Sequence, residues 1–228
     1  RFADHKFAFL EQINRESARK QEYVTGAVPV KCAGLYHSEP SLLAAGASDE
    51  ANLAARRFGA AVDVFRGLSL PCEVVPNWNC RDEVLAPFDL LVVSELPCLS
   101  DGEIAAFERF VERGGCLLVC GGSGIRDEHD RPRSHYPLHR LLGLSYDRLC
   151  DRYAGNGITG YVRWVDHPYF GHLRPADYQL WNRWPLAEAT DAHVVAPIVE
   201  PVAVETDDNY TGWFPLPPGN PGTWAGLT

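Results

Sequence analysis

Residues 88–124 read FDLLVVSELPCLSDGEIAAFERFVERGGCLLVCGGSG, and this stretch decides the fold of the 228-residue chain. Leu90–Val93 and Cys116–Cys120 are apolar runs too short for helices, so they predict two strands. Between them, Ser100 and Glu103 predict a helix that begins with a capping box, and Gly114 marks its end. Two wholly apolar strands joined by an amphipathic helix indicate a βαβ crossover in a parallel sheet covered on both faces.

The preceding segments extend this pattern. Val30–Tyr36 and Cys72–Val75 predict two further strands, and apolar residues at helical spacing predict a helix over Glu50–Phe65 between them. The order β-α-β-β-α-β favours an α/β fold, a three-layer sandwich with a mostly parallel sheet of the flavodoxin-like or Rossmann-like kind.

Three segments make up the expected domain organisation. Residues 1–28 form a connector helix whose apolar face needs a packing partner. Residues 29–150 form the α/β domain. Residues 151–228 form an irregular, β-rich extension that we expect to belong to the same domain.

Within the extension, Ile158–Val165 and His193–Val204 predict strands, the latter confined to a sheet edge by its prolines. The aromatic, proline-rich residues 166–190 predict a folded loop with one helical turn. The final residues, 215–228, read as a loop-like tail. Earlier in the chain, Leu138–Leu144 predicts a short helix that Gly143 ends.

Composition excludes several classes of protein. The formal net charge is −9 and no basic stripe is present, which argues against a nucleic-acid partner. No apolar run approaches the length of a membrane span. The chain begins with Arg1 and contains no methionine, so we expect either a piece of a longer protein or a sequence from which modified residues are missing.

The seven cysteines are odd in number and form no C-x-x-C pair. We interpret them as small buried hydrophobes of a protein in a reducing compartment, the cytoplasm. A zinc site would need paired ligand spacing, which is absent. The turn Gly121–Gly124 lacks the G-x-G-x-x-G spacing of a dinucleotide site, and the carboxylates of Asp127 and Glu128 would repel an anion there. No cofactor is therefore predicted.

Cys120 ends a predicted strand before two glycines, where a nucleophile could sit on a sharp turn. This plan resembles the class I glutamine amidotransferases, whose elbow reads G-x-C-x-G. Leu118 replaces the first glycine, and His167-Pro168-Tyr169 stands where that family has His-Pro-Glu. A thiol without a positioned base and carboxylate is weakly activated. Cys120 with His167 stays open as a catalytic alternative, beside a buried strand cysteine.

Two other groups of residues leave alternatives open. His129, His135 and His139 lie among carboxylates and could bind a metal ion, but a solvated charged loop is the favoured interpretation, and no metal site is predicted. Aromatic side chains cluster between residues 164 and 184, where they could stack on sugar rings, anchor an interface or form a satellite core.

The ordered set of motifs resembles the middle, trimerisation domain of family 42 β-galactosidases. The matching pieces are Cys32–Ser41 (CAGLYHSEPS), residues 88–132, which include Ser123–Arg131 (SGIRDEHDR), and the segment LHRLLGL, and their order matters more than any one of them. The helix before Val30 also resembles the connector that leaves the catalytic barrel of those enzymes. The resemblance covers about residues 30–145, and nothing after Cys150 matches it.

This resemblance implies an amidotransferase-like fold that has lost its catalytic triad, in a protein whose glycosidase carboxylates lie on a separate barrel. The implied role is self-association, or contact with the rest of a larger chain, in a carbohydrate-active protein. The residues expected at such an interface or at a sugar-facing cleft are His37, Ser38, Glu39, Ser123, Asp127, Glu128, His129, Asp130 and Arg131. A cysteine-dependent hydrolase and a sugar-binding module are the alternatives.

Overall fold

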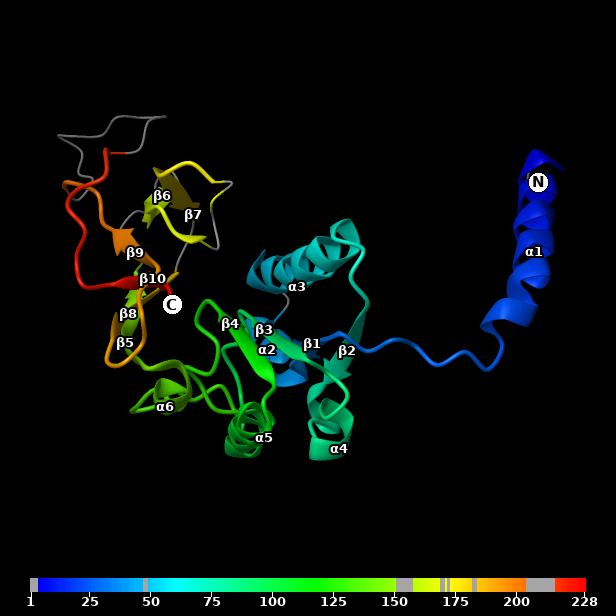
Figure 1. Cartoon of the computed structure of the whole chain (residues 1–228), viewed down its shortest axis with the longest axis horizontal. Helices are drawn as coiled ribbons and strands as arrows, with labels where there is room; N and C mark the ends of the chain where they lie inside the picture. The colour runs from blue at the N-terminus through cyan, green and yellow to red at the C-terminus, as the bar shows by residue number, and fades with distance from the viewer. Residues whose placement is uncertain are drawn as a thin grey trace. The chain divides into compact units, whose positions relative to one another are not determined.

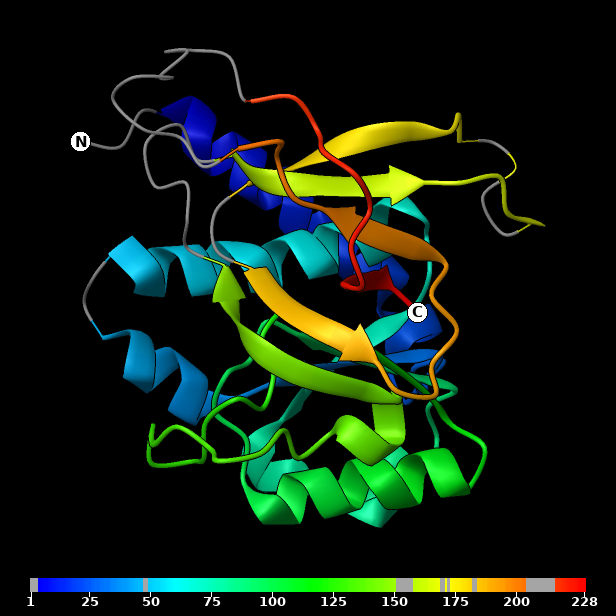
Figure 2. The same ribbon diagram turned by 90° about the vertical axis from the view of Figure 1, so that its left-hand side faces the viewer.

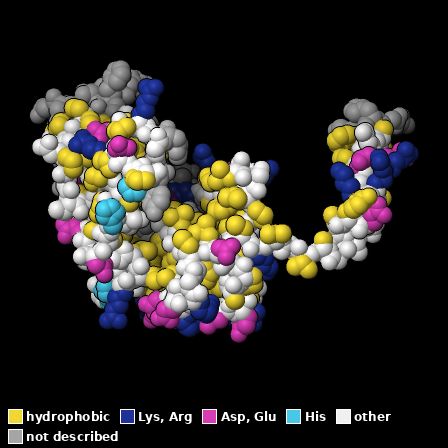
Figure 3. All heavy atoms as spheres, viewed as in Figure 1, with side chains coloured by type: hydrophobic (Ala, Val, Ile, Leu, Met, Phe, Trp, Pro, Cys, Tyr) yellow, Lys and Arg dark blue, Asp and Glu magenta, His cyan; other side chains and the backbone are white. Residues whose placement is uncertain are grey.

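The computed structural model describes residues 4–46, 49–150, 158–168, 171, 173–181, 184–203 and 216–228. The chain divides into two compact units, Arg1–Lys31 and Cys32–Thr228. The first unit contains helix α1 (Asp4–Val24), which confirms the predicted amino-terminal helix (Figure 1). Its apolar side chains Phe7, Phe9 and Leu10 are more than half exposed, beside lysine and arginine side chains (Figure 3).

A four-stranded parallel sheet forms the centre of the second unit (Figure 1). The strand order is β2-β1-β3-β4, and every neighbouring pair is parallel. The strands are β1 (Ala33–His37), β2 (Cys72–Pro76), β3 (Leu90–Ser94) and β4 (Cys116–Cys120). All four strand predictions are confirmed, although the first strand begins at Ala33 rather than at Val30, which is 74% exposed.

Helices follow the strands in the order expected of an α/β fold. They are α2 (Glu39–Ala45), α3 (Asp49–Gly67), the 3₁₀ turn η1 (Asn77–Asn79), α4 (Asp82–Leu85), α5 (Asp101–Glu112) and α6 (His139–Leu142). Helix α2 was not expected from the sequence. Its N-terminus is capped by Ser38, whose Oγ accepts a hydrogen bond from the N–H of Ser41 at 3.2 Å.

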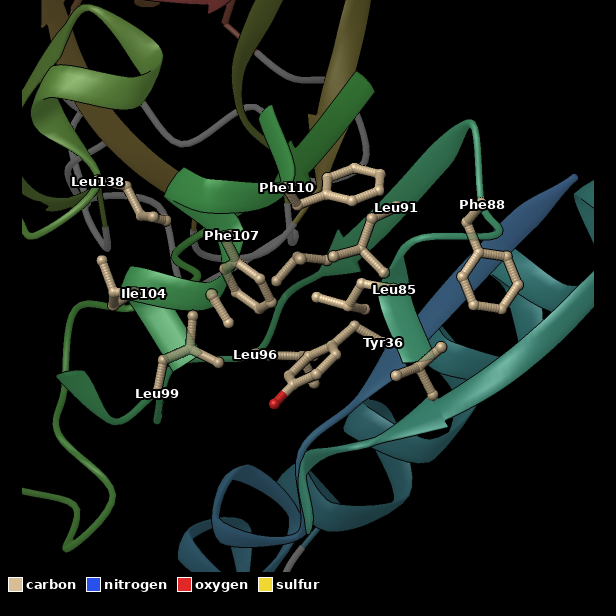
Figure 4. Packing of buried hydrophobic residues seen from close by; sticks show 13 residues of the cluster. Tyr36, Leu85, Phe88, Leu91, Leu96, Leu99, Ile104, Phe107, Phe110 and Leu138 are labelled. Atoms are coloured by element: carbon tan, nitrogen blue, oxygen red, sulfur yellow. The ribbon is translucent and has the colours of Figure 1, made fainter. Parts of the chain in front are cut away.

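Apolar residues are buried on both faces of the parallel sheet. On one face, Ala33, Leu35 and Val92 pack against Phe58 and Phe65 of α3. The alternate strand residues point to the opposite face, where they meet α4 and α5 (Figure 4). That larger core contains Tyr36, Val75, Leu85, Phe88, Leu91, Val93, Leu96, Leu99, Ile104, Ala106, Phe107, Phe110 and Leu138. The fold is α/β; its assignment to the flavodoxin-like or amidotransferase-like sandwich stays a prediction.

The predicted capping box at the start of α5 is present. Ser100 Oγ accepts from the N–H of Glu103 at 3.2 Å, and Glu103 Oε2 accepts from the N–H of Ser100 at 2.6 Å. The same carboxylate accepts a hydrogen bond from the buried Tyr36 hydroxyl, which joins β1 to α5. Burial raises the pKa of Tyr36 far above its ordinary value, and the neighbouring Cys80 and Glu103 raise it further. Tyr36 is therefore a neutral donor.

Antiparallel strands make up the rest of the second unit (Figure 2). Strands β5 (Leu144–Cys150) and β8 (Trp184–Ala189) form a two-stranded sheet. A second sheet has the order β10-β9-β6-β7, with β6 at Ile158–Trp164, β7 at Ala176–Trp181, β9 at Ala196–Val199 and β10 at Ala225–Leu227. The two strands predicted in this region are present as β6 and β9, but the edge position expected for the second was wrong, because β9 lies between β10 and β6.

Two predictions for this region were wrong. Residues 166–190 contain β7 and β8 rather than a folded loop, and the tail of residues 215–228 contains β10. Pro185 made β8 look irregular, but a two-stranded sheet consists of edges, where proline is tolerated. Strand β7 is held by cross-strand side chains, since Arg163 of β6 makes two hydrogen bonds to Asp177, at 2.6 and 2.9 Å.

All seven cysteines are free. The expectation that they are buried is confirmed for Cys98 and Cys150; it was wrong for Cys116, which is exposed on the edge strand β4, and the other four are only partly buried. Over the described ranges, no helix is both long enough and apolar enough to cross a membrane.

Candidate functional site

The strongest cluster of chemically active side chains lies at the carboxyl end of the parallel sheet. In open α/β sheets, ligands bind in the crevice at this end. Ser94 and Cys120 are register partners at the ends of β3 and β4. His37 lies two residues after Leu35, which pairs with Val92 of β3. By alternation all three side chains face α3, and each of them is partly buried.

Glu95 follows Ser94 and joins this cluster to α3. Its carboxylate forms an ion pair with Arg57, and each of the two side chains is 32% exposed. A Cβ atom at Gly121 would lie 2.4 Å from Glu95 Cγ, so the glutamate packs directly over the turn after β4. Burial raises the pKa of Glu95, and the positive charge of Arg57 only partly opposes that rise.

The backbone at this end of the sheet is unusual. Glu95 has φ of +52° and Gly121 has φ of +61°, both in the left-handed region. The N–H of Glu95 donates to the carbonyl of Cys120 at 3.0 Å, which holds the two turns together. A glutamate in this region is strained, and such strain gathers at functional sites.

Cys120 is a half-buried residue of β4. Burial raises the pKa of its thiol, and the negative charge of Glu95 raises it further, so the sulfur is a neutral thiol at physiological pH. A nucleophile elbow places the nucleophile itself on the strained turn. Here the left-handed residue is Gly121, which carries no side chain, and Cys120 remains in the strand.

His167, the proposed partner of Cys120, lies in the segment after β6. Its ring faces that of His193, with 6.5 Å between the ring centroids. The charged neighbour that raises the pKa of Cys120 is the carboxylate of Glu95. A carboxylate is a weaker base than an imidazole and does not readily accept the thiol proton at neutral pH. Pairing of Cys120 with His167 stays a prediction.

Two of the predicted interface residues, Ser38 and Ser123, are fully buried and serve the backbone. Ser38 Oγ donates to the carbonyl of Cys98 at 2.9 Å, beside its capping bond at α2. Ser123 Oγ accepts from the N–H of Leu96 at 3.0 Å and donates to the carbonyl of Cys120 at 2.8 Å. These hydrogen bonds position the segments that follow the strands around the cluster.

The other predicted residues near β1 lie at its edge. The His37 ring meets Phe58 of α3 edge to face, with 5.2 Å between centroids. Glu39 is exposed at the start of α2, and its N–H donates to Asn77 Oδ1 at 3.2 Å. The structure therefore brings His37 to the cluster, whereas Glu39 lies beside it on the surface.

Asp127–Arg131 forms a closed surface loop. Asp127 Oδ1 accepts from the N–H groups of His129 and Arg131, each at 2.9 Å, and Oδ2 accepts from Arg131 Nε at 2.7 Å. These bonds to the backbone and to Arg131 lower the pKa of Asp127. Asp130, with φ of +63°, accepts from Arg126 Nη1 at 3.0 Å. Glu128 and His129 are exposed beside each other, 3.8 Å apart.

The loop's ionic groups are thus engaged with one another. Among the residues that the structure describes, no group of three or more His, Cys, Asp or Glu side chains is arranged to hold a metal ion. On the surface seen in Figure 3, acidic and basic side chains are interspersed.

The aromatic cluster divides into two parts. Trp184 packs on Cys150, Leu186 and Ile198, which makes it part of a satellite core. Trp164 and Tyr178 form an edge-to-face pair on β6 and β7, with 6.1 Å between centroids. Tyr169 and Phe170 lie outside the described residues, as does the Trp181 side chain.

Sequence reasoning missed Arg57 and Glu95. Glu95 carried a signal, because it is the charged residue that directly follows a buried strand. Arg57 carried none, since it is one of two consecutive arginines of α3 and only the packing of that helix brings it to the strand ends.

Comparisons with known proteins identify the fold. No family model matches the sequence, and no curated protein matches it significantly. A solved β-galactosidase from Bacillus circulans sp. alkalophilus matches with a TM-score of 0.70 and 17% identity, over 84% of this chain and 28% of that chain. A GH42 β-galactosidase from G. stearothermophilus matches with a TM-score of 0.65 and 19% identity, over 80% and 26%.

An α-L-fucosidase, isoenzyme 2 from Paenibacillus thiaminolyticus, matches with a TM-score of 0.64 and 17% identity, over 93% of this chain and 30% of that chain. At such identities the similarity establishes the fold alone. The chain is an α/β domain with the fold of one part of these larger glycosidases. It spans less than a third of the length of each of them.

Proposed function

We propose that the chain is a non-catalytic accessory and oligomerisation domain of a cytoplasmic, carbohydrate-active protein of the β-galactosidase type. The observation that carries this proposal is that most of the chain matches about a quarter of the length of solved β-galactosidases, one of them a GH42 enzyme. In this proposal the matched part accompanies the catalytic part of those enzymes and does not contain it. The middle, trimerisation domain of that family is the specific counterpart we propose.

The chemistry of the strand end supports this proposal. A catalytic thiol needs a lowered pKa and a base within hydrogen-bond reach. Cys120 has a raised pKa and a carboxylate neighbour. The loop Asp127–Arg131 and the exposed Glu39 would then contact a second copy or the rest of a longer chain.

Activity assays on the chain test the proposal. We expect no turnover of nitrophenyl glycosides and no release of ammonia from glutamine by the purified chain. Turnover that Cys120→Ala abolishes, and that Cys116→Ala on the same strand leaves intact, would show a cysteine-dependent hydrolase instead.

Sedimentation velocity tests the oligomerisation part separately. We expect the chain to sediment as an oligomer whose population grows with protein concentration, and a loop variant, Arg131→Ala, to shift it toward the monomer. A chain that remains monomeric at every concentration would contradict self-association.

A further inference from the structure

We propose that the carboxyl end of the parallel sheet is a binding site for a neutral polyhydroxylated ligand, a hexose-sized sugar. The site consists of His37, Ser94 and Glu95 at the strand ends, with Arg57 and Phe58 of α3 above them. This inference goes beyond the accessory role, because it concerns a ligand of this domain itself and would hold for any parent protein.

Register and printed contacts bring these residues together from three separate elements of the sequence. His37 and Ser94 each lie two residues after the last register pair of β1 and β3, Leu35 and Val92, so alternation places them on the same side of the sheet. Arg57 reaches the same end of the sheet through its ion pair with Glu95. Phe58, the next residue of α3, meets the His37 ring at 5.2 Å.

The charges of the site favour a neutral ligand. Arg57 and Glu95 compensate each other, and Cys120 beside them is a neutral thiol, so neither an anion nor a cation gains a net attraction. A guanidinium offers five donors and a carboxylate about four acceptor positions, more than their mutual contact uses. Both side chains are one-third exposed, so water or a ligand reaches them.

Vicinal hydroxyl groups match this set of donors and acceptors. A sugar hydroxyl both donates and accepts, so one can donate to Glu95 while its neighbour accepts from Arg57. Ser94 and His37 can each donate or accept as the ligand requires. Phe58 adds an aromatic ring beside His37, against whose face the apolar C–H groups of a sugar can pack.

The strained turn keeps the carboxylate in place before a ligand arrives. The left-handed backbone of Glu95 is fixed by its bond to the Cys120 carbonyl, and the next N–H, of Leu96, donates to Ser123 at 3.0 Å. A fixed acceptor lowers the entropy that binding must overcome. A ligand site therefore accounts for the strained backbone of Glu95, which the accessory role does not explain.

Saturation-transfer NMR on the purified chain tests the site with D-galactose, D-glucose and L-glutamine as probes. We expect transfer to the ring protons of at least one sugar and a millimolar dissociation constant by calorimetry. Arg57→Gln and Ser94→Ala should each weaken binding, the former by about tenfold, because it removes a charged hydrogen-bond donor. The matched control is Arg66→Gln, in the last turn of α3 and paired with exposed Asp63, which should bind as the wild type does.

Three outcomes would overturn the proposal. One is the absence of transfer to either sugar, and another is transfer to L-glutamine alone. The third is sugar binding that persists in Arg57→Gln and Ser94→Ala but is lost in Tyr178→Ala, which would place the sugar on the aromatic pair of β6 and β7. None of these results depends on whether the chain self-associates or hydrolyses glycosides.

Discussion

Glu95 shows how one residue can combine backbone strain, partial burial and a charge at the end of a strand. Burial raises its pKa despite Arg57, so the folded protein binds the carboxyl proton more tightly than the unfolded chain does. The stability that this proton contributes is complete below the ordinary glutamate pKa and is lost as the pH rises through the pKa of the folded state.

We therefore expect the wild type to gain stability relative to Glu95→Gln as the pH falls from about 7 to about 5, a range above the ordinary glutamate pKa. Urea denaturation of both proteins at each pH measures this difference. Asp127→Asn is the control, because the pKa of Asp127 is lowered, so its contribution is complete above the ordinary aspartate pKa and its difference from the wild type should stay constant between about pH 7 and about pH 5. A Glu95 difference that shrinks with acid would contradict the account.

Ser123 is the residue that holds the ends of β3 and β4 in place. Its fully buried hydroxyl accepts from the N–H of Leu96 and donates to the Cys120 carbonyl. Ser123→Ala leaves that N–H without its acceptor, and we expect the free energy of unfolding to fall by about 1–3 kcal/mol. Urea denaturation measures it, with the exposed Ser134→Ala as the control. Equal stability of the two variants would show that the bond is dispensable.

At the scale of elements, the parallel sheet could be predicted because each strand is a short apolar run between turn residues. Helix α2 was missed, although Ser38, Pro40 and Gly46 mark its two ends as a cap, a first-turn proline and a terminating glycine. Its seven residues are too few to show an apolar period. Strands β7 and β8 were missed because Pro185 and the aromatic residues obscured the alternation of the strands.

Gly143 links two elements that are distant in sequence. It ends α6 with φ of +64°, and its carbonyl accepts from the N–H of Thr190 at 2.8 Å after β8. A Cβ atom there would lie 2.7 Å from the backbone nitrogen of Ala192. The predicted glycine end of this helix is therefore also a packing requirement.

Gly143→Ala should destabilise the protein more than the left-handed backbone alone explains. Gly114→Ala is the matched control, since Gly114 has φ of +93° and open space around its Cβ position. We expect the control to lower the free energy of unfolding by about 1 kcal/mol and Gly143→Ala to lower it further. Thermal and urea denaturation report both values. Equal losses would mean that the segment after β8 moves aside without cost.

For the whole molecule, the class of fold follows from periodicity, whereas the candidate site follows only from packing. The sequence pointed to Cys120 and His37 through their places at strand ends, and to the loop Asp127–Arg131 through the family resemblance. It could not place Arg57 beside Glu95, because that contact depends on how α3 lies across the sheet. The antiparallel strands after Cys150 have weaker patterns, and their pairing joins residues far apart in the chain.

The central claim is that Cys120 is a structural thiol of an accessory domain, and alkylation measures this most directly. The chain is treated with iodoacetamide at neutral pH, natively and in urea, and each cysteine is followed by peptide mass. Exposed Cys116, four residues away, is the internal control and should react in the native protein. We predict that Cys120 reacts only after unfolding; alkylation of native Cys120 faster than that of Cys116 would contradict the account.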